Sequence, residues 1–262
     1  MSKRISRIIN DVQDRNSVAW AKLCEYIDLL AEKESDEFSP REYLGDELFS
    51  DIYTLPESIS KLKKVKKIWL YGSKLKCIPP EIGQMESLEY FDPYTSYDLH
   101  WFPYEITDCN NLKDSRISTR VLYGNYKNRM GFPRLDKNPV RYFREKLHCS
   151  VCKKGITYEE TNQLWISLKI GTDIVPLLVN ACSEQCEKSL PKPPENYVQY
   201  PHKGGSDLKQ PPDEDEMGEI EREKRECGES QLEDNSYQEL NKEKESDKLK
   251  LFNVIRKIWE KK

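Results

Sequence analysis

The chain has 262 residues, of which 34% are charged, and a formal net charge of −4 at pH 7. This length is too great for one small domain and is sufficient for two or three. The near-neutral balance lacks the strongly basic character of many nucleic-acid-binding proteins. The sequence has no apolar run of about 18 residues, which a transmembrane helix requires, and it begins without the apolar core of a signal peptide. We therefore expect a cytoplasmic protein.

The first 50 residues predict a helical module. Residues 2–33 place apolar side chains at helical spacing. Ser17 is suited to cap a helix, and Pro40 favours the start of another helix directly after Ser39. Such a module either binds a partner or shields the apolar edge of the segment that follows, and we favour the shielding role.

One phrase recurs three times between residues 55 and 122: an apolar residue, a proline, two variable residues and an isoleucine. It stands at Leu55–Ile59, Ile78–Ile82 and Phe102–Ile106, in steps of 23 and 24 residues. Self-similarity at this period predicts stacked repeats, because a single copy cannot bury its own apolar edge.

This pattern resembles the leucine-rich repeat family, whose unit is a short strand, a turn and a return segment that opens near the proline. Ser73, Pro93 and Ser115 depart from the family pattern at positions where an Asn, a strand leucine and an apolar residue are expected. Residues 123–140, rich in Gly, Asn and Pro, predict an inserted loop and the end of the repeats. The resemblance implies a short solenoid and a role in protein recognition.

A strand in such a unit alternates its side chains between two faces. Ile68 and Leu70 then point to the core, and the residues between them point to the concave face. The residues that we expect to bind a partner on this face are Lys67, Trp69, Tyr71, Tyr90, Asp92, Tyr94 and Arg116. Aromatic residues and arginine are enriched at interface hot spots. The alternative, in which these rings pack on each other or under a loop, is equally compatible with the pattern.

Four of the eight cysteines form two close pairs separated by 29 residues. This spacing is typical of a structural zinc site with four thiolate ligands, here Cys149, Cys152, Cys182 and Cys186. The apolar pattern between the pairs predicts a hairpin, and the second pair is expected at the start of a short helix. A knuckle, a hairpin and a helix in this order resemble a treble-clef zinc finger. The alternative is four core cysteines without a metal.

A catalytic role for this metal is not expected, because four cysteines leave no open position for water. No histidine lies between His148 and His202, and the motifs of metalloproteases, deaminases and phosphate-binding loops are absent. His148 is a candidate to replace or support a ligand, and His202 is a weaker candidate. Basic residues near the cysteines, including Lys153 and Lys154, give weak support to nucleic-acid binding.

The last part of the chain changes in composition after Pro191. Residues 207–247 contain 16 acidic and 6 basic residues, which predicts a linker followed by an acidic, low-complexity segment. The last residues predict an amphipathic helix that docks on the chain itself or on a partner. Its apolar face would carry Leu251, Phe252, Ile255, Ile258 and Trp259.

Together these patterns predict an α+β protein in which a helical cap precedes a leucine-rich repeat solenoid and a small ββα zinc module. The expected segments are 1–50 for the cap, 51–140 for the repeats, 141–192 for the zinc module, 193–247 for the linker and acidic segment, and 248–262 for the C-terminal helix. The expected function is non-enzymatic binding of a protein partner on the concave face. The alternative is a nucleic-acid-binding regulator that uses the zinc module and the adjacent basic residues.

Overall fold

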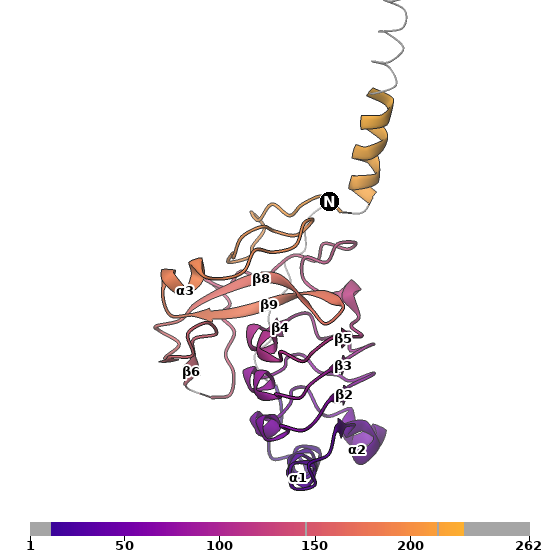
Figure 1. Ribbon diagram of the computed structural model, residues 1–262, viewed down its shortest axis with the longest axis vertical. Coiled ribbons are helices and arrows are strands. Elements are labelled where there is room, and N and C mark those ends of the chain that lie inside the picture. The colour runs from indigo at the N-terminus through magenta and orange to yellow at the C-terminus, as the bar shows by residue number, and fades with distance from the viewer. Residues whose placement is uncertain (1–11, 145, 214, 228–262) are drawn as a thin grey trace, which may run out of the picture. The chain divides into compact units, whose positions relative to one another are not determined.

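The computed structural model describes residues 12–227, except 145 and 214. The chain divides into two compact units, residues 1–211 and 212–262. Helices and strands are mixed in the first unit (Figure 1), so its fold class is α+β, as the sequence predicts. Within the described ranges, no helix is long and apolar enough to cross a membrane.

The elements of the first unit follow one another as short segments and one long hairpin. In chain order they are α1 (Val18–Glu32), β1 (Glu37–Phe38), α2 (Pro40–Phe49), the 3₁₀ helix η1 (Glu57–Lys61), β2 (Lys67–Trp69), η2 (Pro80–Gln84), β3 (Tyr90–Asp92), β4 (Phe102–Pro103), η3 (Tyr104–Asp108), β5 (Asp114–Ser115), η4 (Thr119–Val121), β6 (Leu147–His148), β7 (Gly155–Ile156), β8 (Asn162–Ile170), β9 (Asp173–Ala181) and α3 (Glu184–Lys188).

Helix α1 begins directly after Ser17, whose hydroxyl accepts a hydrogen bond from the backbone N–H of Trp20 at 3.1 Å. Upstream, the Asp14 carboxylate accepts a hydrogen bond from the Asn16 N–H, and residues 12–17 are not helical. The predicted helical stretch is therefore interrupted at residues 12–17, and α1 begins after the cap that the sequence predicts, Ser17. Residues 2–11 lie outside the described residues.

The copies contribute β2, β3 and β5 to one parallel sheet, and β1 from the N-terminal segment extends it in the order β1-β2-β3-β5. Equivalent positions lie side by side, since Lys67 pairs with Tyr90 and Tyr90 pairs with Asp114. The middle residues of the two longer strands, Ile68 and Phe91, are fully buried. Parallel strands that bury the same position in each copy place their exposed side chains on one common face.

The proline of each copy precedes a 3₁₀ helix, so η1, η2 and η3 form a row beside the strands (Figure 1). The isoleucines of the recurring phrase, Ile59, Ile82 and Ile106, are buried as the sequence predicts. The second and third copies approach closely at Gly83, where an added Cβ would lie 2.3 Å from the carbonyl oxygen of Glu105. Glycine is needed there because backbone occupies the space.

A second sheet, in the order β4-β9-β8, joins the third copy to the predicted hairpin. Phe102 pairs with Leu177 in parallel, and β8 and β9 pair in antiparallel fashion from Asn162–Ala181 to Ile170–Asp173. Apolar residues of the copies and of the hairpin belong to one buried cluster. The predicted boundary between residues 140 and 141 therefore does not separate two cores.

The turn of this hairpin covers the outer edge of β5. The Thr172 hydroxyl donates to the Ser115 carbonyl oxygen at 2.8 Å, and the Ser115 N–H donates to the Thr172 Oγ1 atom at 3.3 Å. The Ser115 hydroxyl lies 2.8 Å from the Asp173 carboxylate. Gly171 has a φ of 56° and lies against the backbone of Asp114, which leaves no room for a Cβ. The backbone polar groups of the last strand are thus satisfied without another strand.

Residues 193–211, which the sequence assigns to a linker, belong to the first compact unit. His202 and Trp165 exchange two backbone hydrogen bonds at 2.8 and 3.0 Å, and the His202 ring packs against Phe132. The Trp165 indole N–H donates to the Pro133 carbonyl oxygen at 3.0 Å. The segment is ordered because it pairs with β8 and closes an aromatic cluster.

The second unit is described only in part. Residues 215–227 are helical. The predicted C-terminal helix over residues 248–262 lies outside the described residues.

Candidate functional site

The first cysteine pair lies in a tight turn between β6 and β7. The Cys149 N–H donates to the Lys154 carbonyl oxygen at 2.8 Å, and the Lys153 N–H donates to the Cys149 carbonyl oxygen at 2.9 Å. Lys153 has a φ of 62°. This turn brings Cys149, which is buried, and Cys152, which is exposed, to the same side of the loop.

The second pair lies at the junction of β9 and α3. Cys182 directly follows the strand, and Cys186 lies within the helix. Ser183 caps the helix, since its hydroxyl accepts a hydrogen bond from the Cys186 N–H at 3.3 Å. Cys186 therefore lies in the first turn of the helix, as expected, and Cys182 lies just before it.

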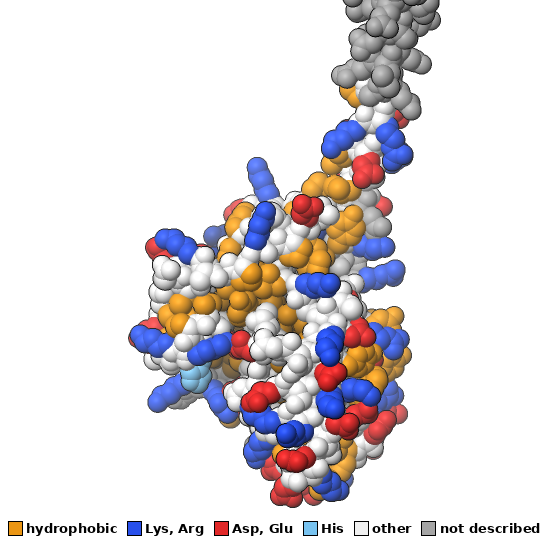
Figure 2. Space-filling model, viewed as in Figure 1, with side chains coloured by type: hydrophobic (Ala, Val, Ile, Leu, Met, Phe, Trp, Pro, Cys, Tyr) orange, Lys and Arg blue, Asp and Glu red, His pale blue; other side chains and the backbone are white. Residues whose placement is uncertain are grey.

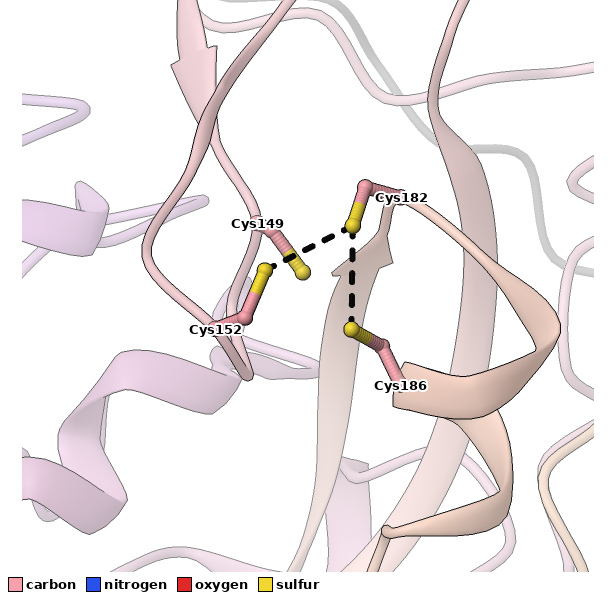
Figure 3. Close-up of side chains that lie close together, drawn as sticks. All are labelled: Cys149, Cys152, Cys182 and Cys186. Carbon is pink, nitrogen blue, oxygen red and sulfur yellow. Dashed lines mark hydrogen bonds between the residues drawn. The ribbon is translucent and has the colours of Figure 1, made fainter.

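The four sulfur atoms gather within 4.8 Å of one another (Figure 3). The Cys152 and Cys182 sulfurs are 3.5 Å apart, and the Cys182 and Cys186 sulfurs are 3.6 Å apart. These separations far exceed the ~2.05 Å of a disulfide bond. They are close to the edge of about 3.8 Å in a tetrahedron with Zn–S bonds of about 2.3 Å. The four cysteines are thus arranged as a group that can bind a metal ion.

The electrostatics of the turn favour a thiolate at Cys149. Burial alone would raise the pKa of this thiol, but the backbone N–H groups of Cys152, Val151 and Cys182 lower it to about 6. The neighbouring sulfurs raise the pKa of Cys182. Thiolates are the form in which cysteine binds metals, so a bound cation would displace the remaining protons of the cluster.

Neither candidate histidine belongs to the group of metal-binding side chains found in the described part of the chain. His148 pairs with Gly155 across β6 and β7, and it is exposed. The Nδ1 atom of His202 accepts a hydrogen bond from the Gly204 N–H at 3.1 Å, and burial lowers the pKa of His202 to about 4. His202 is therefore a neutral core residue rather than a ligand.

The residues predicted for the concave face lie on adjacent strands and their following turns. The Arg116 guanidinium carbon lies 4.4 Å from the ring centroid of Tyr94 and 5.9 Å from that of Tyr71. Trp69 and Tyr90 form a second ring pair with centroids 5.0 Å apart. Figure 2 shows hydrophobic side chains, tyrosine included, gathered beside the edge of the sheet near β3 and β5, with charged side chains around them.

Asp92 differs from the prediction, because it is 2% exposed. Its carboxylate accepts hydrogen bonds from the Tyr94 N–H at 3.0 Å and from the Tyr90 hydroxyl at 3.3 Å. Arg116 lies 3.7 Å from it. Asp92 thus orients three of the predicted residues from beneath and is not available to a partner.

Sequence reasoning missed Glu37 on β1. Its carboxylate accepts from the Lys67 ammonium at 2.8 Å and from the Trp69 indole at 3.1 Å. A two-residue strand gives too little alternation to assign a face, so no signal in the sequence identifies this residue. Glu37 holds Trp69 and Lys67 in place at one end of the face.

Two of the basic residues near the cysteines form ion pairs with acidic side chains. The Lys153 ammonium contacts the Asp108 carboxylate, and Arg144 lies 2.9 Å from Glu81. Such pairing reduces the positive charge that a nucleic-acid phosphate would meet.

No known family model matches this chain, and no curated protein matches it significantly.

Proposed function

We propose that this chain is a non-enzymatic protein-recognition module. In this proposal, residues 51–140 form a leucine-rich repeat solenoid, and its exposed strand face binds a protein partner. The observation that supports it most is the cluster of Tyr71, Tyr94 and Arg116, three side chains from successive copies that contact one another. Tyr71 is 45% exposed and Tyr94 is 37% exposed.

The chemistry of this cluster suits recognition of a protein surface. Tyrosine offers a large, rigid and amphipathic contact area with little loss of conformational entropy. The two tyrosine rings, with centroids 6.0 Å apart, and the arginine stacked on them hold each other before binding. Preorganised groups of this kind lower the entropic cost of association.

A photocrosslinking amino acid at position 71 tests this proposal in cell extract. We expect covalent adducts with protein that disappear when Arg116→Glu is added, because the reversed charge disrupts the stacked cluster. The matched control carries the same crosslinker at Tyr200, which is exposed outside this face. Adducts that are removed by nuclease would support the nucleic-acid alternative instead. Adducts that are identical at both positions would contradict the proposal.

We further propose that Cys149, Cys152, Cys182 and Cys186 hold one structural zinc ion. Support comes from the sulfur separations and from a donor set of four thiols, which closes the coordination sphere to water. A zinc ion there would tie the turn after β6 to the start of α3. Metal content per chain, measured after purification without added metal, tests this assignment. About one zinc ion per chain supports it, and a well-folded chain without metal contradicts it.

A further inference from the structure

A cavity lies between the 3₁₀ helices of the second and third copies and the segment around β6. Its volume is about 420 Å³, and its walls include Pro79, Pro80, Glu81, Glu105, Tyr142 and Asn180. Cavities that bind small molecules commonly fall in a range of about 300–1,000 Å³. The cavity is separate from the exposed face of Tyr71 and Tyr94, since none of its lining residues comes from the strands of the parallel sheet.

Three of the residues that line this cavity each carry a buried side-chain polar atom with no hydrogen-bond partner among the described residues. These atoms are the Glu105 Oε2 atom, the Tyr142 hydroxyl oxygen and the Asn180 Nδ2 atom. A buried polar atom without a partner is destabilising, and one such atom in a native protein calls for an explanation. Three such atoms among the residues that line one cavity indicate that a bound molecule supplies their hydrogen-bond partners.

The orientation of the Asn180 amide is fixed by its neighbours. The Val140 N–H donates to the Gln163 Oε1 atom at 2.8 Å, which makes the other end of Gln163 the donor. Gln163 Nε2 then donates to the Val140 carbonyl oxygen and to the Asn180 Oδ1 atom, both at 2.9 Å. The free Asn180 Nδ2 atom is therefore a hydrogen-bond donor to the cavity.

The Glu105 carboxylate is placed beside Asn180 by a shared neighbour. The Ser150 hydroxyl donates to Glu105 Oε1 at 2.7 Å and accepts from the Asn180 N–H at 2.9 Å. The second carboxylate oxygen, Oε2, remains as an acceptor. These three lining residues thus offer an acceptor at Glu105, a donor at Asn180 and, at Tyr142, a hydroxyl that can act as either.

Four of the charged side chains that line the cavity form two ion pairs. Glu81 lies 2.9 Å from Arg144, and Asp108 contacts Lys153. An ammonium ligand would donate to Glu105 but would leave the Asn180 N–H without an acceptor. A carboxylate ligand would accept from Asn180 but would repel the Glu105 carboxylate. A neutral group that carries an N–H beside a C=O satisfies both atoms.

We propose that this cavity binds a small neutral ligand through an amide-type edge, such as a carboxamide or a lactam. The ligand N–H donates to Glu105 Oε2, and the ligand carbonyl accepts from Asn180 Nδ2 and from the Tyr142 hydroxyl. The apolar rest of the ligand lies along Pro79 and Pro80.

Three probes with the same pyridine ring test the proposal: nicotinamide, nicotinate and 3-picolylamine. Binding to the full chain is measured by NMR titration at about pH 8, where Glu105 is ionised. We expect nicotinamide to bind with a Kd on the order of 1 mM, as suits a fragment of this size. The carboxylate and the amine should bind at least about tenfold more weakly, because each leaves a buried atom unpaired.

Two variants assign the binding to this cavity. Tyr142→Phe removes only a hydroxyl that lacks a partner, so the fold should persist while nicotinamide binding falls about tenfold. Tyr200→Phe makes the same change at an exposed site and should leave binding unchanged. Asn180→Asp replaces the donor by an acceptor and should shift the preference from nicotinamide to 3-picolylamine.

The proposal is overturned if neither nicotinamide nor acetamide binds at concentrations of about 20 mM. It is also overturned if the three pyridine probes bind equally, or if Tyr142→Phe binds nicotinamide as well as the unmodified chain does. In those cases Glu105, Tyr142 and Asn180 do not form a site that recognises an amide edge.

Discussion

The repeated copies and the hairpin that follows them hold their structure together in different ways. In the copies, equivalent isoleucines such as Ile59, Ile82 and Ile106 are buried one after another. The hairpin shares this apolar core and adds specific polar contacts to distant segments. Examples are the bond from Gln163 Nε2 to the Val140 carbonyl oxygen and the Ser115–Asp173 bond at the turn.

The difference shows how stability is distributed in the first unit. Burial of many similar apolar side chains spreads the free energy of folding over the copies, so each substitution removes a limited share. The four cysteines proposed to hold zinc would act as a unit, because the loss of one ligand weakens metal binding by the other three. We therefore expect a large loss of stability when one cysteine of the cluster is replaced, and smaller losses when single side chains of the copies are replaced.

The largest effect is expected from Cys182→Ser, which removes one of the four proposed metal ligands. Structural zinc contributes directly to folding, so we expect loss of bound zinc and destabilisation above about 4 kcal/mol. Metal analysis and chemical denaturation measure the two outcomes. Cys227→Ser, which changes an exposed cysteine outside the cluster, is the control. Equal stability of the two variants would remove the structural role of the cluster.

A smaller effect is expected from Ile82→Ala in the second copy. Ile82 is fully buried, and truncation of such a side chain costs about 2–5 kcal/mol. Urea denaturation measures the change, with Ile220→Ala at a 36% exposed position as the control. A cost near that of the control would mean that the copies do not share a rigid core.

The buried Glu105 makes stability depend on pH. Burial raises the pKa of Glu105 from 4.5 to about 7, so the folded protein holds the proton at pH values where the unfolded chain has lost it. This contribution is fully present below pH 4.5 and is lost as pH rises to about 7, with a limit of about 3 kcal/mol. Glu105→Gln should remove this slope.

Denaturation of both proteins between the two pKa values, and above them, checks this expectation. The difference in unfolding free energy between the unmodified chain and the Gln variant should change steadily through this range. A constant difference would show that Glu105 titrates normally in the folded protein.

The smallest effect on stability is expected from Tyr71→Ala. Tyr71 is 45% exposed, and surface substitutions usually change stability by less than about 0.5 kcal/mol. The same variant should reduce the capture, in a pull-down, of the protein that the crosslinker at position 71 labels. If Tyr71→Ala unfolds the protein, the ring supports the sheet rather than a partner.

The sequence predicts the buried positions of the copies well, because the same apolar residue recurs at the same place in each copy. Ile68 and Leu70 are buried as expected from strand alternation. Asp92 breaks the alternation, since β3 ends there and Pro93 redirects the chain. The hydrogen bonds of Asp92 to its neighbours cannot be predicted from the alternation of side chains along a strand.

The spacing of the four cysteines is sufficient to predict that they lie together, because each pair lies in a local turn that depends on few residues. The cavity was not predicted, since Glu105, Tyr142 and Asn180 meet only through contacts between distant segments. The one local signal is an acidic residue directly before the buried isoleucine, at Glu81 and again at Glu105. The order of residues 193–211 was missed because their partner, β8, lies far upstream.

The covered edge of β5 has a consequence for the length of the molecule. The turn at Gly171 and Thr172 occupies the place where the strand of a further copy would pair. An exposed strand edge invites pairing with other chains, and here that template is occupied by the chain itself. If a duplicated copy were inserted between the second and third copies, the hairpin turn would still cover the edge of β5. If it were added after the third copy, the edge of the new last strand would be exposed. The hairpin thus limits the sheet to the strands that it has and prevents other chains from pairing with the edge of β5.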